Sequence, residues 1–238
     1  KSLDAFTHSA ELAPKHADSQ HWMGRCFAEM GRYEDANEHY ERALTLDSEN
    51  AKFIYYLGYL YEKQDKQEDA IEQYDKAIAI KEDYAEAYLR KGIILRKQNK
   101  YINAIKMFRK ASHYNPRLNT SRLEQGDCYI ELNQVDQALQ FYKEALKQDP
   151  DDPRAHFKIS RAYMEQRKFK EAISHLERGL RIDNDNADAY LKLGWSLKWV
   201  KRYGEAVNAF KRYLELEPQA IDKADIEQQI QFLQSKDR

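Results

Sequence analysis

Residues 54–80 read IYYLGYLYEKQDKQEDAIEQYDKAIAI, and the spacing of small and apolar residues in this stretch is helical. In its first part, such residues occur at i, i+3, i+4 and i+7, at positions 54, 57, 58 and 61. After the polar break 65–67, they recur three or four apart, at positions 70, 74, 77 and 80. Each part therefore forms one apolar helix face, and the stretch predicts two antiparallel helices joined by a short turn.

The same pattern returns every 34 residues along the chain. Alanine occurs at positions 36, 70, 104, 138, 172 and 206, and a large apolar residue at 40, 74, 108, 142, 176 and 210. Glycine occurs at positions 24, 58, 92, 126 and 194. The small residues let two helices approach closely, and the large residue fills the space beside them. A period this regular over six copies indicates a solenoid rather than a globule with one core.

The order of Leu-Gly, Tyr, Ala and a large ring resembles the tetratricopeptide repeat (TPR), whose period is 34 residues. Residues 56–80 carry this motif well, and residues 190–218, YLKLGWSLKWVKRYGEAVNAFKRYLELEP, carry it almost fully. The resemblance covers essentially the whole chain. It implies an all-α fold, namely a right-handed superhelical TPR solenoid of antiparallel helix pairs.

The period divides the chain into six full repeats with a partial element at each end. We expect the repeats at 17–50, 51–84, 85–118, 119–152, 153–186 and 187–220. Residues 1–16 match the second helix of a truncated upstream repeat, so we expect the native protein to continue N-terminal to Lys1. Residues 221–238 have one apolar stripe on a polar segment, which is typical of a C-terminal capping helix.

The composition excludes several classes of protein. The 238 residues include 39 Lys and Arg against 40 Asp and Glu, and a net charge of −1 disfavours nucleic acid as a partner of the whole chain. The longest stretch without a charge, 53–61, is too short to span a bilayer, so no membrane insertion is expected. Two cysteines exclude a disulfide-dense secreted scaffold. Residues 1–15 lack the features of a secretory signal, and we therefore expect a cytoplasmic location.

No enzyme motif is present in the sequence. It contains no P-loop, no HExxH and no CxxC, and its seven histidines lack the spacing of metal ligands. We therefore expect no catalytic residues, no metal and no cofactor. The TPR resemblance implies a protein–protein interaction scaffold or adaptor in a multiprotein complex. Two alternatives stay open: the chain is the recognition arm of a longer enzyme, or it is a self-assembling structural protein.

The candidate binding surface is the face of each first helix that turns away from its partner helix. In the TPR family this face lines a concave groove. A merely solvated face would be mostly Glu, Lys and Gln, whereas this one is rich in aromatic residues and arginine, which are enriched at binding hot spots. The candidate groove residues are Trp22, Arg25, Tyr55, Tyr56, Tyr59, Leu89, Arg90, Ile93, Arg96, Phe157, Arg161, Trp195 and Trp199.

We expect the aromatic residues of this face to anchor an extended or helical segment of a partner. Arg90, Arg96 and Arg161 would then set its register on acidic side chains or backbone carbonyls. The alternative is that superhelical curvature or a neighbouring element buries part of the face. TPR proteins that bind chaperone C-termini use a two-carboxylate clamp that needs Asn at the sixth repeat position. No repeat has Asn there, so chaperone binding by this clamp is not expected.

Charge is unevenly distributed among the repeats. Residues 85–118 hold nine Lys and Arg and one acidic residue, Glu86, whereas the repeats on either side are net acidic. The acidic neighbours interrupt any continuous track for a phosphate backbone, which disfavours nucleic acid. This basic belt instead favours an acidic and apolar protein or peptide, or the acidic repeat of another copy, as the partner. A homo-oligomer and membership of a larger assembly are therefore both open alternatives.

Overall fold

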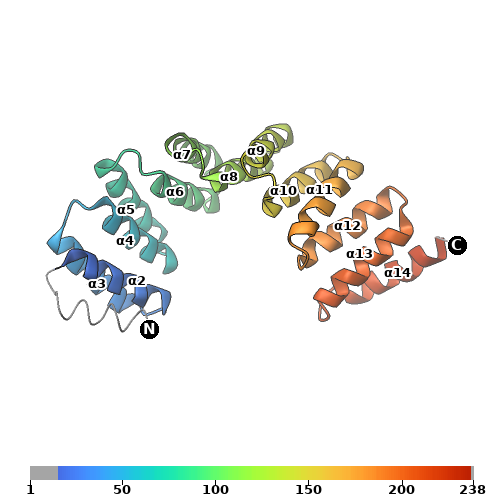
Figure 1. Cartoon of the computed structure of the whole chain (residues 1–238), viewed down its shortest axis with the longest axis horizontal. Helices are drawn as coiled ribbons and strands as arrows, with labels where there is room; N and C mark the ends of the chain where they lie inside the picture. Colours follow the sequence, from blue (N-terminus) through green and yellow to red (C-terminus); the bar gives the residue numbers. More distant parts are fainter. Residues whose placement is uncertain (1–15, 237–238) are drawn as a thin grey trace. The chain divides into compact units, whose positions relative to one another are not determined.

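The structure is a computed structural model, and it describes residues 16–236. The expected partial repeat at 1–16 therefore lies outside the described residues, except for His16. The chain divides into two compact units, 1–121 and 122–238, which are considered separately below. Every regular element between residues 16 and 236 is an α-helix (Figure 1).

The described part of the first unit consists of helix pairs, each a 13-residue helix followed by a 14-residue helix. The helices of each pair pack against each other, and α3 packs on α4 as α5 packs on α6. The pairs are α2 (Ala17–Glu29) with α3 (Tyr33–Leu46), α4 (Ala51–Lys63) with α5 (Gln67–Ile80), and α6 (Ala85–Lys97) with α7 (Tyr101–Tyr114). Helix α8 (Asn119–Glu131) crosses the boundary between the units.

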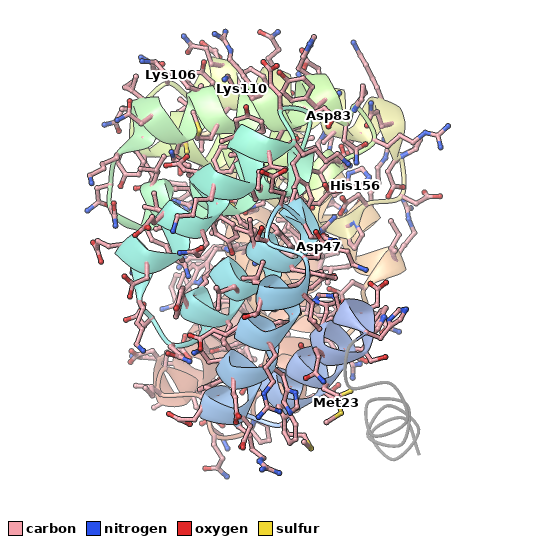
Figure 2. All side chains as sticks on the ribbon, turned by 90° about the vertical axis from the view of Figure 1, so that its left-hand side faces the viewer. Met23, Asp47, Asp83, Lys106, Lys110 and His156 are labelled. Atoms are coloured by element: carbon pink, nitrogen blue, oxygen red, sulfur yellow. The ribbon has the colours of Figure 1, made fainter. Side chains whose placement is uncertain are left out.

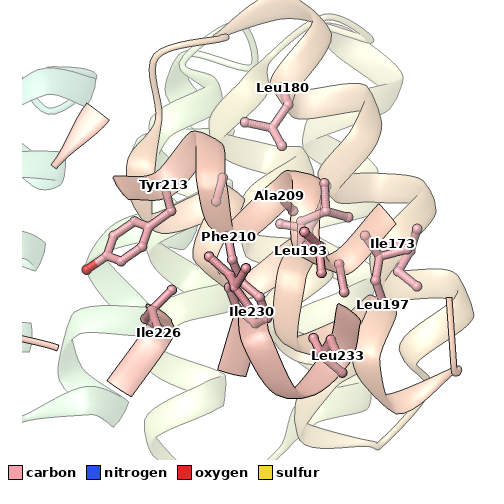
Figure 3. Packing of buried hydrophobic residues seen from close by; sticks show 14 residues of the cluster. Ile173, Leu180, Leu193, Leu197, Ala209, Phe210, Tyr213, Ile226, Ile230 and Leu233 are labelled. Carbon is pink, nitrogen blue, oxygen red and sulfur yellow. The ribbon is translucent and has the colours of Figure 1, made fainter. Parts of the chain in front are cut away.

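The second unit continues the same arrangement. Its remaining helices are α9 (Val135–Gln148), α10 (Pro153–Glu165), α11 (Phe169–Ile182), α12 (Ala187–Trp199), α13 (Tyr203–Leu216) and α14 (Lys223–Lys236). Helix α14 packs on α13 and buries Ile226, Ile230 and Leu233 in the cluster that surrounds Phe210 (Figure 3). The predicted all-α architecture of paired helices is confirmed.

Small residues on the first helix of a pair make room for a ring from the second. A Cβ atom on Gly92 would lie 2.6 Å from Cε1 of Phe108, which is fully buried. Real carbon atoms do not approach so closely, so glycine permits this packing. One pair reverses the arrangement: the ring of Phe157, on the first helix α10, lies against Gly179 on the second helix α11.

The turns inside the helix pairs share one backbone feature. Gly31 and the residues at 65, 99, 133, 167 and 201, each 34 further on, have positive φ angles between 56° and 73°. This left-handed conformation at the end of a helix closes its last turn, as the hydrogen bond from the Lys66 amide to the Tyr61 carbonyl at 2.9 Å shows. The turns therefore set the antiparallel direction of each second helix.

Candidate partner-binding site

Three first helices of the first unit place aromatic and basic side chains around one cavity. Helices α2, α4 and α6 begin 34 residues apart, so equivalent positions recur along the unit. The cavity, called here the tyrosine cavity, has a volume of about 210 Å³. Its lining residues are Arg25, Ala28, Glu29, Tyr40, Tyr55, Tyr56, Tyr59 and Arg90. The structure thus brings together five of the residues that the sequence put forward.

Arg25 forms part of the wall and lies against two aromatic rings. Its guanidinium carbon is 4.5 Å from the centroid of the Trp22 ring and 4.8 Å from that of Tyr56. Lys52 also lies over the Trp22 ring, with Nζ 5.2 Å from the centroid. Cation–π contacts of this kind contribute about 0.5–2 kcal/mol, depending on how far they are desolvated. Trp22 and Tyr56 therefore hold the Arg25 side chain in place.

Arg90 belongs to a network that joins three helices. Its Nη1 atom is 3.5 Å from Oε1 of Glu62, and its guanidinium carbon is 4.7 Å from the centroid of the Tyr59 ring. Glu62 also accepts a hydrogen bond of 2.8 Å from the hydroxyl of Tyr74. Burial raises the pKa of Tyr55, and the neighbouring Arg90 opposes that rise. Because Glu62 compensates its charge, Arg90 stabilises the cavity wall from within the unit.

A buried histidine lies behind this surface. His21 is fully buried, its ring is stacked on Phe53 with centroids 4.9 Å apart, and it meets Tyr56 edge-on at 4.8 Å. Neither ring nitrogen has a hydrogen-bond partner. Burial, reinforced by the positive charges of Lys52 and Arg25, lowers the pKa of His21 to about 3. The imidazole is therefore neutral at physiological pH and acts as an apolar ring.

The other candidate residues of the first unit lie outside the tyrosine cavity. Leu89 is only 9% exposed and belongs to the core, so it offers little surface to a partner. Ile93 and Arg96 are half-buried on α6. Neither contributes to the lining of the cavity.

The second unit places its two candidate tryptophans beside another hollow. Trp199 is 66% exposed, and its ring is stacked on Phe169 with an angle of 1° between the planes. Trp195 is half-buried and meets Phe210 edge-on, with centroids 5.2 Å apart. The hollow has a volume of about 370 Å³ and is lined by Trp195, Lys198, Trp199, Lys201, Tyr203, Phe232 and Leu233.

Phe157 and Arg161 do not line this hollow. The Phe157 ring is held between α10 and α11 by its contact with Gly179, so it serves packing inside the pair. Arg161 is exposed, and its Nε donates to Oε1 of Glu165 at 3.2 Å, while Nη2 is 4.0 Å from Glu131. Its charge is therefore already partly compensated by two carboxylates.

Some lining residues were not among those put forward from the sequence. Tyr40 lines the tyrosine cavity, and Phe232 lines the hollow of the second unit. Tyr40 occupies the ring position of its repeat and was interpreted as packing alone. Its repeat position gave no signal that one edge of the ring reaches the cavity. Phe232 lies beside the apolar stripe of the last helix, and its exposed fraction of 50% marks it as surface.

The basic belt is visible on the outer helix α7. Lys106 and Lys110 (labelled in Figure 2) and Arg109 between them are exposed on this helix, and Nζ of Lys110 lies 5.0 Å from the centroid of the Tyr88 ring. On α6, Lys91 donates to both carboxylate oxygens of Asp75, the longer distance being 2.7 Å. The belt is thus partly compensated on α6 and exposed on α7.

Residues 16–236 contain neither a cluster of metal ligands nor a membrane-spanning helix. No group of three or more His, Cys, Asp or Glu side chains there is placed to hold a metal ion. No helix in this range combines the length and the apolar character that crossing a membrane requires.

Family models match most of the chain in four segments. Three describe TPR repeats and match residues 24–65, 51–84 and 163–226. The fourth, described as anaphase-promoting complex, cyclosome, subunit 3, matches residues 97–179. Together with the paired helices and the 34-residue period, these matches show that the chain belongs to the TPR family.

Solved structures with the same fold have low sequence identity to this chain. YrrB, described as a TPR protein with an unusual peptide-binding site, is 21% identical with a TM-score of 0.63, and the match covers 79% of this chain and 97% of YrrB. PilF of Pseudomonas aeruginosa is 18% identical with a TM-score of 0.77, covering 89% and 96%. A chain of the Cut9–Hcn1 hetero-tetramer of the APC/C is 15% identical with a TM-score of 0.74, covering 94% and 45%. No curated protein matches the sequence significantly. At identities below 25%, these similarities show that the chain shares the fold of these proteins.

Proposed function

We propose that this protein is a non-catalytic interaction scaffold or adaptor that binds a segment of a protein partner on the aromatic faces of its first helices. The tyrosine cavity is the principal contact in this proposal, and the hollow beside Trp195 and Trp199 is a second. The partner segment is extended or helical, and its apolar side chains pack against the tyrosine rings.

The observation that carries this proposal is the tyrosine cavity itself. Tyr55 and Tyr56 lie on one turn of α4 and Tyr59 on the next, and all three are half-buried, so each ring is held by the protein and still has a free edge. Rigid, partly exposed tyrosines beside arginine are typical of binding hot spots, because they bury a large area at a small cost in conformational entropy. A peptide-binding site in the similar fold of YrrB is consistent with this use.

The test begins with affinity capture from the source cell, read by mass spectrometry. Wild type is compared with the variant Tyr55→Ala/Tyr59→Ala. The matched control is Tyr101→Ala/Tyr114→Ala, which removes two tyrosines from α7 of the same unit, away from the cavity. Binding of the purified partner is then measured by isothermal titration calorimetry.

We expect the cavity variant to bind at least about tenfold more weakly, as removal of two hot-spot side chains implies, and the control to bind as wild type does. Circular dichroism checks that both variants keep their helices. Equal affinity of the cavity variant and wild type, with equal helicity, would show that the partner binds elsewhere. The exposed face of α7 would then be the next surface to test.

The proposal includes two finer expectations. The chain carries out no catalysis of its own, since the sequence has no catalytic motif. It binds its partner in the cytoplasm. This expectation rests on the two cysteines of the sequence, because small secreted domains are commonly rich in disulfides. Fractionation of the source cell with an antibody against the protein would test the location, and recovery in a secreted or periplasmic fraction would contradict it.

A further inference from the structure

Arg25 differs from Arg90 and Arg161, two other arginines of the candidate surface, in how its charge is compensated. Arg90 is paired with Glu62, and Arg161 is paired with Glu165. None of the ion pairs formed among residues 16–236 includes Arg25. Its contacts are the faces of Trp22 and Tyr56, which orient the guanidinium without neutralising it.

The surroundings of Arg25 favour a negative charge from outside. Lys52 adds a second cation at the Trp22 ring, and the buried His21 remains neutral between these two positive charges. The acidic residue of the lining is Glu29, which is exposed, while the nearby Glu62 is engaged by Arg90 and Tyr74. The wall around Arg25 therefore has an excess of positive charge that a bound carboxylate would balance.

The size of the cavity limits what can enter it. Pockets for whole small molecules have volumes of about 300–1,000 Å³, and the tyrosine cavity, at about 210 Å³, is smaller. It suits one side chain of a larger partner. Four of the eight lining residues are tyrosines, so the chain next to the bound side chain can pack on aromatic surface.

We propose that the tyrosine cavity binds the carboxylate of an aspartate or glutamate side chain within the partner segment, and that the Arg25 guanidinium is its ligand. An apolar residue next to this acid packs on Tyr55 and Tyr59. This inference rests on the proposed function, and it assigns to Arg25 the recognition of acidic side chains that the sequence had assigned to Arg90, Arg96 and Arg161.

The probe for this inference is a library of random 12-residue peptides displayed on phage, with the peptide C-terminus fused to the coat protein. Fusion removes the free terminal carboxylate, so a selected acid must be a side chain. Selections are run on wild type, Arg25→Gln and Tyr55→Ala/Tyr59→Ala. We expect peptides from wild type to share an Asp or Glu next to an apolar residue, and peptides from Arg25→Gln to lack the acid.

The best peptide is then synthesised with blocked ends, in its original form and with the shared acid changed to its amide. A charge-assisted hydrogen bond contributes about 1.5–3 kcal/mol, so we expect Arg25→Gln to lose about 10- to 100-fold in affinity for the acidic peptide. Wild type should bind the amide peptide about 10- to 100-fold more weakly than the acidic peptide. Arg25→Gln should bind the two peptides with nearly equal affinity. Arg25→Lys should retain part of the affinity, and Glu29→Gln should bind the acidic peptide more tightly than wild type.

Each outcome decides between the inference and the proposed function. Peptides that require Tyr55 and Tyr59 but bind Arg25→Gln as tightly as wild type would overturn the inference and leave the proposed function intact. Selected peptides whose shared acid can be changed to its amide without loss of affinity for wild type would overturn the assignment to a side-chain carboxylate. Failure to select any peptide that depends on the two tyrosines would overturn both. Thermal melts of each variant separate loss of binding from loss of fold.

Discussion

The hydroxyl of Tyr74 donates a hydrogen bond of 2.8 Å to Glu62, and in this way the second helix of a pair is tied to the first. The other unit contains the same device, because Tyr142 donates to Asp127 at 2.8 Å. In both cases a cation from the following repeat contacts the same carboxylate, Arg90 at 3.5 Å from Glu62 and Lys158 at 2.7 Å from Asp127. The carboxylate thus links two neighbouring repeats.

Removal of the Tyr74 hydroxyl tests this link. Tyr74→Phe keeps the buried ring but deprives Glu62, whose side chain is only 11% exposed, of one donor. Hydrogen bonds to charged groups contribute about 1.5–3 kcal/mol, and Arg90 partly replaces this one, so we expect a loss of about 1–2 kcal/mol in stability. Urea denaturation followed by circular dichroism measures it.

Tyr61→Phe is the matched control, because the Tyr61 hydroxyl forms no hydrogen bond within residues 16–236. This variant should change stability by less than about 0.5 kcal/mol. Equal denaturation midpoints for Tyr74→Phe and Tyr61→Phe would mean that the Glu62 hydrogen bond contributes nothing to stability.

The close approach of α6 and α7 gives a second prediction. Gly92→Ala places a Cβ atom 2.6 Å from the ring of Phe108, and overpacking of this kind costs about 1–3 kcal/mol. A smaller side chain at position 108 removes the clash. In a double-mutant cycle with Phe108→Leu, we therefore expect the double variant to be more stable than the sum of the single effects by about 1 kcal/mol. Strict additivity in urea denaturation would argue against contact between these two residues.

The sequence predicted the helix pairs well because the pattern depends on local spacing. Apolar residues three and four apart define a helix face, and a 34-residue period repeats that face along the chain. The same geometry placed Arg25, Tyr55 and Tyr59 on the free face of their helices, and the structure brings them to one cavity. Residues whose role follows from their position on one helix could thus be predicted from the sequence.

Roles that depend on contacts between helices were not predictable in the same way. Phe157 occupies a free-face position, but the missing side chain of Gly179 opens a space on α11 that its ring fills. Leu89 also has a free-face position, yet it is 9% exposed. The pairing of Arg90 with Glu62 depends on two side-chain conformations in different repeats. Spacing along the chain contains none of this information.

The left-handed turn residues give a third prediction. Arg167 has φ of 56°, a conformation that costs a residue with a side chain about 1–2 kcal/mol and costs glycine nothing. Glycine also has more freedom in the unfolded chain, which offsets part of the gain. We expect Arg167→Gly to stabilise the protein by about 0.5–1 kcal/mol, and Arg167→Ala, which keeps a Cβ atom, to give no gain. Thermal unfolding of the three proteins measures this, and a gain for alanine as large as that for glycine would contradict the explanation.

The buried histidine gives a prediction about pH. The pKa of His21 is about 3 in the folded protein, against about 6.5 in an unfolded chain. Between these two values the unfolded chain binds more protons, so His21 lowers stability as the pH falls through this window and has no such effect above pH 6.5. At pH 5 the loss from this residue is about 2 kcal/mol relative to pH 7.5.

The variant His21→Phe keeps an aromatic ring in contact with Phe53 and Tyr56 and cannot be protonated. We therefore expect its stability to fall less than that of wild type between pH 7.5 and pH 5, by about 2 kcal/mol. His113→Phe, at an exposed position of α7, is the control and should follow wild type. The measurement is urea denaturation at a series of pH values. The same decline for His21→Phe and wild type would show that the acid sensitivity comes from other groups, of which the partly buried His175, with a pKa of about 4, is the next to test.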